Sequence, residues 1–405
     1  MKCGLLGRKL SHSYSPAIHA QLGDYEYGLF EKEPEQVASF LHQGNWDGLN
    51  VTVPYKQTVI PYLDELDPIA AKLGAVNTIL RRNGKLIGLN TDFGAFRAMV
   101  VKSCLSPAGK KCLVLGSGGA SKVAVAVMED LGAEVIVISR KGENHYQNLH
   151  RHQDAAIIVN TTPVGMYPNT GVSLVDLELF PRLEGVLDVI YNPARTQLLM
   201  DAEQRGIVAM NGLWMLIVQA QEASCMMTGH AVSNETAEQT YAVMRQRMEN
   251  IVLIGMPGCG KSTVGRLLAE KLGKTFLDTD AEIEKMANKT IPQIFTEDGE
   301  AHFRVLETKV LAEFGKQSGL VIATGGGCVT QAHNYPLLHQ NGRIFWLQRD
   351  LDKLATKGRP LSVDLEGLYR DRQKQYEAFA DCIVHNNSAL QETAASILAD
   401  WEDLS

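Results

Sequence analysis

A glycine-rich stretch with a lysine and a serine, Gly255 to Ser262, matches the pattern G-x-x-x-x-G-K-[ST] in full. It follows the apolar run Ile251 to Ile254 and precedes a helix-like stretch, Thr263 to Leu272. In such a strand–loop–helix context, backbone N–H groups and the helix N-terminus cradle phosphates, while the lysine and the serine serve the outer phosphates and Mg²⁺. We predict a phosphate-binding loop formed by Gly258, Cys259, Gly260, Lys261, Ser262 and Thr263.

Acidic residues and glycines further along suit the same chemistry. Asp278 ends a strand-like run and could hold Mg²⁺ through water, and Asp280 could accept a proton or a hydrogen bond from a substrate hydroxyl. After the strand-like run Leu320 to Ala323 come three consecutive glycines, Gly325, Gly326 and Gly327. Glycines at that position let the backbone approach a ligand closely.

Three arginines add positive charge to this half of the chain. Arg304 and Arg372 could each clamp a carboxylate through two hydrogen bonds. Arg359 lies in a segment that contains glycine and proline, and it could close over a transferred phosphate as part of a lid.

A second glycine turn lies in the first half, between a strand-like run, Lys111 to Leu115, and a helix-like stretch, Ala120 to Leu131. It is a variant dinucleotide fingerprint that we expect to bind a cofactor through Gly116, Gly118, Gly119 and Ala120. After the next strand, Glu134 to Ile138, an NAD enzyme would place an acidic residue, whereas this chain has Arg140 between Ser139 and Lys141. A basic residue there suits a 2′-phosphate and favours NADP.

The first 92 residues carry polar groups that suit a small substrate. Ser13 and Ser15 open a helix and could hold a carboxylate. Lys56 comes just after a strand, and Asn77 and Asp92 stand at the ends of strand-like runs. A lysine and an aspartate that face one pocket make a plausible proton-transfer pair.

The elements that must position these groups alternate between short apolar strands and amphipathic helices along almost the whole chain. That alternation is typical of α/β proteins, with parallel sheets covered by helices. A chain of 405 residues is expected to form two or three domains. The boundary is expected near 248–250, where a charged helix ends and a new strand begins.

The amino-acid composition argues against some classes of binding partner. The net charge of −7 argues against nucleic acid or an anionic membrane, and no apolar stretch approaches the roughly 18–20 residues of a membrane span. The seven cysteines are scattered without C-x-x-C spacing, which suggests reduced thiols and a cytoplasmic location.

Residues 250–405 resemble shikimate kinase over essentially their full length, through the motifs quoted above. The resemblance implies that ATP and shikimate give shikimate 3-phosphate, with Lys261 steadying the transferring phosphoryl group and Asp280 and Arg359 in catalysis. It also implies Mg²⁺ near Ser262 and Asp278. The implied shikimate-binding residues are Asp280, Arg304, Gly325, Gly326, Gly327 and Arg372. The family lid usually carries another arginine upstream of Arg-Pro-Leu, and 354–359 has none, although Lys357 could substitute as a point charge.

Residues 1 to about 245 resemble shikimate dehydrogenase. The matching motifs run in order from Ser13-Tyr14-Ser15 and Asn50 to Lys56, through Asn77-Thr78, Asn90-Thr91-Asp92, the glycine turn, Asn160 to Met166 and Asp188 to Pro193, to Gly212 to Leu216 and Gln219. The resemblance implies NADPH-dependent reduction of 3-dehydroshikimate to shikimate, with Lys56 and Asp92 as the catalytic pair and Met166 near the nicotinamide. The implied substrate contacts are Ser13, Ser15, Thr52, Asn77, Tyr191 and Gln219.

The sequence therefore predicts an α/β fusion of two consecutive enzymes: a two-lobed dehydrogenase with a Rossmann-type cofactor lobe, then a P-loop kinase with a parallel sheet. The expected substrate lobe is 1–92 plus 213–245, the NADP-binding lobe 93–212 and the kinase domain 250–405. Two alternatives stay open: an NAD-dependent quinate/shikimate dehydrogenase, or one half acting as a non-catalytic ligand sensor. Oligomeric state does not follow from the sequence.

Overall fold

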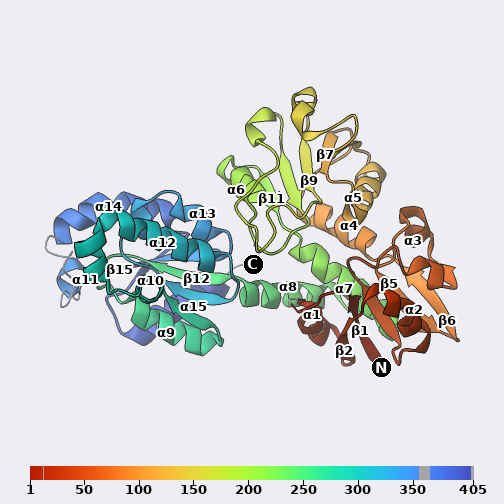
Figure 1. Cartoon of the computed structure of the whole chain (residues 1–405), viewed down its shortest axis with the longest axis horizontal. Coiled ribbons are helices and arrows are strands. Elements are labelled where there is room, and N and C mark those ends of the chain that lie inside the picture. The colour runs from red at the N-terminus through yellow and green to blue at the C-terminus, as the bar shows by residue number, and fades with distance from the viewer. Residues whose placement is uncertain (12, 355–364, 403–405) are drawn as a thin grey trace. The chain divides into compact units, whose positions relative to one another are not determined.

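The computed structural model describes residues 1–11, 13–354 and 365–402, and Figure 1 shows the chain. The chain forms two compact units. The first consists of Met1–Val164, Ser173–Tyr191 and Asp201–Met244, and the second of Gly165–Val172, Asn192–Met200 and Arg245–Ser405. Within the described ranges, no helix combines the length and the apolar character that a membrane crossing needs.

The first sheet of the first unit has six strands in the order β2-β1-β3-β5-β6-β4. Their bounds are β1 Lys2–Gly7, β2 Glu26–Glu31, β3 Gly48–Val51, β4 Glu65–Leu66, β5 Thr78–Arg82 and β6 Lys85–Leu89. The accompanying helices are α1 Ser15–Leu22, α2 Pro34–Gln43 and α3 Pro68–Leu73. Leu6, Leu49 and Ile79 are fully buried in the apolar cluster on this sheet.

This sheet is mixed, whereas the alternation of elements predicts parallel pairing. β1 pairs in parallel with β2 and β3, but β5 is antiparallel to both β3 and β6. The reason is local: β5 and β6 are joined by Asn83 and Gly84, both with positive φ (53° and 79°). A two-residue Asn-Gly turn of this kind joins antiparallel strands, because a parallel connection needs a long crossover.

The second sheet of the first unit has five strands in the order β11-β10-β9-β7-β8, with parallel neighbours. Their bounds are β7 Lys111–Leu115, β8 Glu134–Ile138, β9 Ile157–Asn160, β10 Gly185–Asp188 and β11 Val208–Met210. The helices that follow along the chain are α4 Asp92–Lys102, α5 Gly119–Asp130, α6 Gln197–Gln204, α7 Leu213–Thr228 and α8 Asn234–Met248. The glycine turn thus lies between a strand and a helix, as a dinucleotide fold requires.

The second unit contains a five-stranded parallel sheet in the order β13-β14-β12-β15-β16. Its strands are β12 Asn250–Ile254, β13 Thr275–Asp278, β14 Leu320–Ala323, β15 Gly342–Gln348 and β16 Cys382–His385. Its helices are α9 Lys261–Leu272, α10 Thr279–Ala287, α11 Ile291–Gln293, α12 Gly299–Gly315, α13 Asn334–His339, α14 Leu365–Phe379 and α15 Leu390–Glu402.

Helices cover both faces of this third sheet, with α9 and α15 on one side and α12, α13 and α14 on the other (Figure 1). Every residue of the central strand β12 is buried, which accounts for its unbroken apolar run. From β12 the chain runs to β13 at one edge and back to β14, and it then passes β12 to form β15 on the other side. Ligands of open α/β sheets bind at such a switch point, beside the carboxyl ends of the strands, and the phosphate loop begins there.

Candidate functional sites

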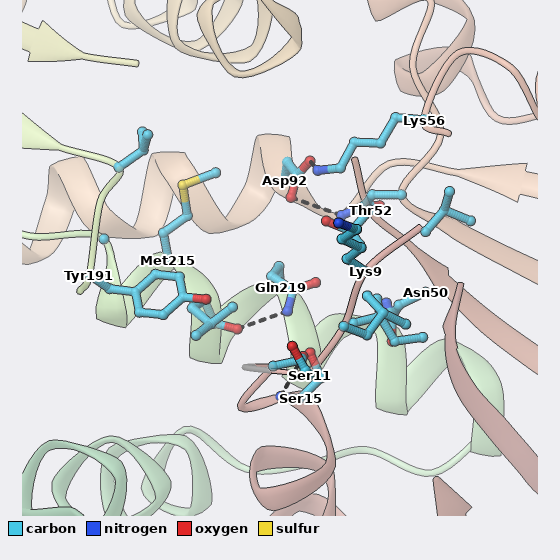
Figure 2. A pocket seen from close by; sticks show the side chains of 18 residues that line it. Lys9, Ser11, Ser15, Asn50, Thr52, Lys56, Asp92, Tyr191, Met215 and Gln219 are labelled. Atoms are coloured by element: carbon cyan, nitrogen blue, oxygen red, sulfur yellow. Dashed lines mark hydrogen bonds and ion pairs between the residues drawn. The ribbon is translucent and has the colours of Figure 1, made fainter. Parts of the chain in front are cut away.

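Lys56 and Asp92 form an ion pair in the first unit, with 2.6 Å between Lys56 Nζ and Asp92 Oδ2. Lys56 lies on the turn after β3, and Asp92 is the first residue of α4. The Lys56 side chain is 30% exposed and that of Asp92 13%, so solvent reaches the pair only in part. Figure 2 shows the two side chains pointing toward each other at the wall of a cavity.

Neighbouring side chains fix the orientation of Asp92. Asn77 Nδ2 donates to Asp92 Oδ1 at 2.9 Å, and the Asn77 side-chain oxygen accepts the Thr91 N–H at 2.8 Å. Asn90 Oδ1 accepts the Asp92 N–H at 3.0 Å. Both carboxylate oxygens of Asp92 therefore have partners, and the oxygen left to Lys56 has a fixed direction.

Hydroxyl groups line another wall of the same cavity. Ser15 is the buried first residue of α1, and its N–H donates to Ser13 Oγ at 3.2 Å. Pro16 follows in the first turn, where its missing N–H costs no hydrogen bond. Two hydroxyls at a helix N-terminus offer donors and a partial positive charge to an anionic group.

Helix α7 supplies the opposite wall through Met215, Leu216 and Gln219. It begins after Gly212, whose Cα lies so close to the Val189 carbonyl that a side chain at position 212 would overlap it. This close approach places the first turns of α7 beside Tyr191, which packs edge-on against Tyr14 at 6.3 Å between ring centres.

The cavity has a volume of about 600 Å³. Of the residues expected to contact substrate or to catalyse, it is lined by Ser13, Ser15, Thr52, Lys56, Asn77, Asp92, Tyr191 and Gln219. Lys9, Ser11 and Asn50 also line it and were not among the predicted site residues. Lys9 and Ser11 share the β1–α1 loop with Ser13, so the density of polar residues in that loop was the available signal.

A second carboxyl group lies close to Asp92. Glu222, on α7, faces the first turn of α4, where a Cβ on Gly94 would lie 2.9 Å from Glu222 Cδ. Burial, together with the negative charge of Asp92, raises the pKa of Glu222 from 4.5 to about 7. No local sequence pattern predicts this, because Glu222 and Asp92 are brought together by the packing of α4 against α7.

The glycine turn at the end of β7 is open on its outer side. Gly118 and Gly119 have no heavy atom within 4 Å of the place where a Cβ would stand, and Gly119 begins α5. Gly116 has φ +110°, and its carbonyl accepts Ser121 Oγ–H at 2.8 Å. Ser121 thus ties the start of α5 to the turn, and Gly118 and Gly119 border open space at the N-terminus of the helix, as a phosphate site needs.

Arg140 is exposed two residues after β8, the strand beside β7. Its position is that of the residue that reads the adenosine ribose in dinucleotide folds. Met166 is 46% exposed and lies in Gly165–Val172, a segment that groups with the second unit. Its place at the nicotinamide therefore stays a prediction.

In the second unit, the loop 255–260 has the shape of a phosphate cradle. Gly255, Gly258 and Gly260 have φ of +143°, +85° and +99°, values that favour glycine. Lys261 is buried, and its Nζ donates to the carbonyls of Gly255 and Met256 at 2.8 and 3.1 Å. The lysine is thereby held within the loop.

Oxygen ligands lie beside this loop. Ser262 Oγ donates to Asp278 Oδ2 at 2.6 Å, and Asp278 Oδ1 accepts the Asp280 N–H at 3.1 Å. A hydroxyl and a carboxylate are the donor set that Mg²⁺ prefers, so these residues fit the expected metal.

Arg304 is held by two carboxylates at the other end of the site. Its Nη1 donates to Glu307 and its Nη2 to Glu300, each at 2.9 Å. Glu307 is fully buried, and burial raises its pKa although the Arg304 charge opposes that shift. Sequence reasoning did not single out Glu307, whose spacing from Arg304 is also that of an ordinary surface ion pair on a helix.

The glycines after β14 are surrounded closely. A Cβ on Gly325 would lie 2.8 Å from oxygens of both Asp280 and Glu307, and one on Gly327 would overlap the Arg304 guanidinium. Arg372 Nη1 donates to the Gly326 carbonyl at 3.1 Å. The structure thus brings the glycines, Asp280 and both arginines together around one space.

That space has a volume of about 550 Å³. The predicted site residues that line it are Gly258, Gly260, Lys261, Ser262, Thr263, Asp278, Asp280, Arg304, Gly325, Gly326, Gly327 and Arg372. Glu284, Phe295, Phe303, Glu307 and Arg349 line it as well and were not predicted. Cys259 is buried within the loop and contributes its backbone, and Arg359 lies outside the described residues.

Comparisons with known proteins assign both halves. The family model for the shikimate dehydrogenase substrate binding domain matches residues 5–79, and that for shikimate kinase matches residues 257–402. The NADP(+) shikimate dehydrogenase of Dehalococcoides mccartyi is 39% identical over 247 residues, which cover 53% of this chain and 86% of that protein. The chain belongs to the shikimate dehydrogenase family.

Solved structures agree. A shikimate dehydrogenase from Peptoclostridium difficile has 34% identity and a TM-score of 0.56 over 60% of this chain and 97% of its own. The Thermus thermophilus shikimate 5-dehydrogenase, solved with NADP(H) and shikimate, has 29% identity and a TM-score of 0.55 over 60% of this chain and 98% of its own. With its C-terminal shikimate kinase domain, this member of the shikimate dehydrogenase family is a bifunctional enzyme, an NADP-dependent oxidoreductase and a kinase.

Proposed function

We propose that the first unit reduces 3-dehydroshikimate to shikimate with NADPH, and that the second phosphorylates shikimate with ATP to give shikimate 3-phosphate. The observation that carries the first step is the Lys56–Asp92 pair, 2.6 Å apart in a cavity lined by hydroxyl and amide groups. The same molecule would then leave one site as product and enter the other as substrate.

In the reduction, NADPH supplies a hydride to the ketone carbon. The oxygen of that carbonyl gains negative charge and must receive a proton, which Lys56 Nζ donates. Asp92 orients the ammonium group and stabilises its charge, and Asn77 holds Asp92 in place. Positioning and electrostatics in a partly shielded cavity supply much of the rate enhancement.

The substrate carboxylate is proposed to bind Ser13 and Ser15 at the start of α1. The ring hydroxyls then face the groups on the other walls, Thr52, Asn77, Tyr191 and Gln219. Their presence in the same cavity as Lys56 supports this orientation.

The cofactor is proposed to lie along the turn after β7, with its pyrophosphate at Gly116, Gly118, Gly119 and Ala120, its 2′-phosphate at Arg140 and its nicotinamide near Met166. The open space at Gly118 and Gly119 supports the pyrophosphate site. In this arrangement the lobe 93–212 carries the cofactor, while 1–92 and 213–245 carry the substrate.

For the kinase domain, 250–405, Lys261 is proposed to steady the transferring phosphoryl group and Asp280 to accept the proton of the attacking hydroxyl. Arg304 and Arg372 hold the shikimate carboxylate against Gly325, Gly326 and Gly327, and Arg359 acts from the lid. Ser262 and Asp278 would hold Mg²⁺, which neutralises charge on the phosphates. The convergence of these groups on one cavity, Arg359 apart, supports the assignment.

Two variants test both roles in the intact chain. Lys56→Ala is expected to lower the turnover of 3-dehydroshikimate reduction by roughly 10²–10⁴-fold, because the proton donor is lost. Lys261→Ala is expected to abolish phosphorylation and leave reduction unchanged. Lys85→Ala, at an exposed pair with Glu65, is the matched control and should leave both activities intact. Near-full reductase activity in Lys56→Ala would overturn the assignment of the proton donor.

A further inference from the structure

Arg349 stands beside the phosphate loop although it is far from it in sequence. It directly follows β15, whose neighbour β12 leads into the loop, and the two strands are parallel with Ile254 opposite Trp346. The carboxyl ends of the two strands therefore meet at the same edge of the sheet. The loop packs against this end, since a Cβ on Gly255 would lie 2.5 Å from the Leu347 carbonyl oxygen.

The Arg349 side chain extends toward the glycine that precedes Lys261. A Cβ on Gly260 would lie 3.7 Å from Arg349 Nη1, and Arg349 lines the same cavity as Lys261 and Ser262. The guanidinium thus reaches the part of the loop whose N–H groups serve phosphates.

This guanidinium has unused donors. Its Nε is buried and has no hydrogen-bond partner among the described residues. The adjacent carboxylate, Asp350, is engaged elsewhere, by Lys353 at 2.7 Å and by Asn387 at 2.8 Å. A buried donor without an acceptor is unfavourable, so a ligand that supplies anionic oxygen there would be favoured.

The backbone that carries Arg349 is fixed. The N–H of Asp350 donates to Asn387 Oδ1 at 3.0 Å, and the neighbouring Asn386 donates from Nδ2 to the Cys259 carbonyl at 2.6 Å. The end of β15, the end of β16 and the phosphate loop are therefore tied together, and the side chain starts from a rigid base.

We propose that Arg349 is a further nucleotide-binding residue of the kinase site, whose guanidinium donates hydrogen bonds to a phosphate held by the glycine loop. The planar guanidinium matches phosphate oxygens in pairs, which a lysine ammonium does not. The proposal rests on the proposed kinase function. Arg349 would supply a positive charge from the end of β15, whereas the segment 354–358 contains no arginine.

The test is equilibrium binding of ATP, ADP and adenosine, with Mg²⁺, to the full chain by calorimetry, followed by steady-state phosphorylation of shikimate. Arg349→Gln is expected to weaken ATP and ADP binding by about tenfold or more, with adenosine binding unchanged. The KM for ATP should rise, and the KM for shikimate should stay the same. Arg349→Lys should recover part of the loss, because it keeps the charge but not the planar fork.

Lys285→Gln is the matched control, since it removes one positive charge from an exposed ion pair of the same unit that does not line the cavity. Thermal unfolding of each variant shows whether the fold is intact. Wild-type ATP and ADP affinity in a folded Arg349→Gln would overturn the proposal, as would an equal loss for adenosine, which would place the contact at the base. If the unmodified chain binds ATP but does not phosphorylate shikimate, the kinase function fails while the nucleotide contact is still measured.

Discussion

At the scale of single residues, each site depends on a charged side chain that is paired with a group of opposite charge. Lys56 meets Asp92, and Arg304 meets the buried Glu307. In each case one partner carries the chemistry and another group fixes its direction, as Asn77 does for Asp92.

Glu222 gives a pH prediction at this scale. Burial and the Asp92 charge raise its pKa from 4.5 to about 7. Between those values the folded protein keeps a proton on Glu222 that the unfolded chain has released, so this group's contribution to stability falls as pH rises through that range. Glu222→Gln removes this pH-dependent contribution to the free energy of unfolding. The variant is therefore expected to be more stable than the unmodified chain, most clearly at pH 7 and above.

The measurement is the urea unfolding of both proteins between pH 5 and 8, monitored by a signal that reports on the first unit. The difference between the two proteins is the informative quantity, because other groups also titrate. His19 is one: burial lowers its pKa to about 3, so its contribution is lost as pH falls below about 6.5. Parallel pH profiles for Glu222→Gln and the unmodified chain would contradict the assignment.

At the scale of elements, the start of α7 determines the position of one wall of the cavity in the first unit. A Cβ on Gly212 would overlap the Val189 carbonyl oxygen, so Gly212→Ala must displace the helix that carries Gln219. We expect a loss of about 1–3 kcal/mol in the unfolding free energy of the first unit and a higher KM for 3-dehydroshikimate. Denaturant unfolding and steady-state reduction measure the two effects.

Gly229→Ala, at the other end of α7, separates displacement from general destabilisation. Gly229 has φ +75° but nothing within 4 Å of a Cβ position. The substitution strains the backbone locally and should lower stability without changing the KM for substrate. An unchanged KM for 3-dehydroshikimate in Gly212→Ala would show that the first turn of α7 does not determine the position of the cavity wall.

The secondary-structure elements also show which features of the fold and of the sites could be predicted from the sequence. The strand–turn–helix units around Gly116 and Gly258 follow from glycines between apolar runs and helical periodicity, because local chemistry determines them. The antiparallel β5–β6 pairing was predictable from Asn83-Gly84 but was outweighed by the alternation of strands and helices. Glu222 and Arg349 reach their sites only through packing of distant segments, and no spacing along the chain signals that. Glu307 lies three residues from Arg304, but this spacing does not distinguish a buried partner from a surface ion pair.

At the scale of the whole molecule, each compact unit holds a cavity with charged groups of its own. Helix α8 begins in the first unit and ends in the second. We expect each activity to survive inactivation of the other, because neither set of site residues draws on the other unit, apart from the proposed Met166 contact.

The central claim is that one chain performs two consecutive reactions on the same molecule. The most direct measurement incubates the purified chain with 3-dehydroshikimate, NADPH, ATP and Mg²⁺, and follows NADPH oxidation, ADP formation and shikimate 3-phosphate together. The proposed functions predict that all three proceed and that shikimate 3-phosphate accumulates. NADPH oxidation without ADP formation, even with added shikimate, would contradict the claim for the kinase domain, and no NADPH oxidation would contradict it for the dehydrogenase.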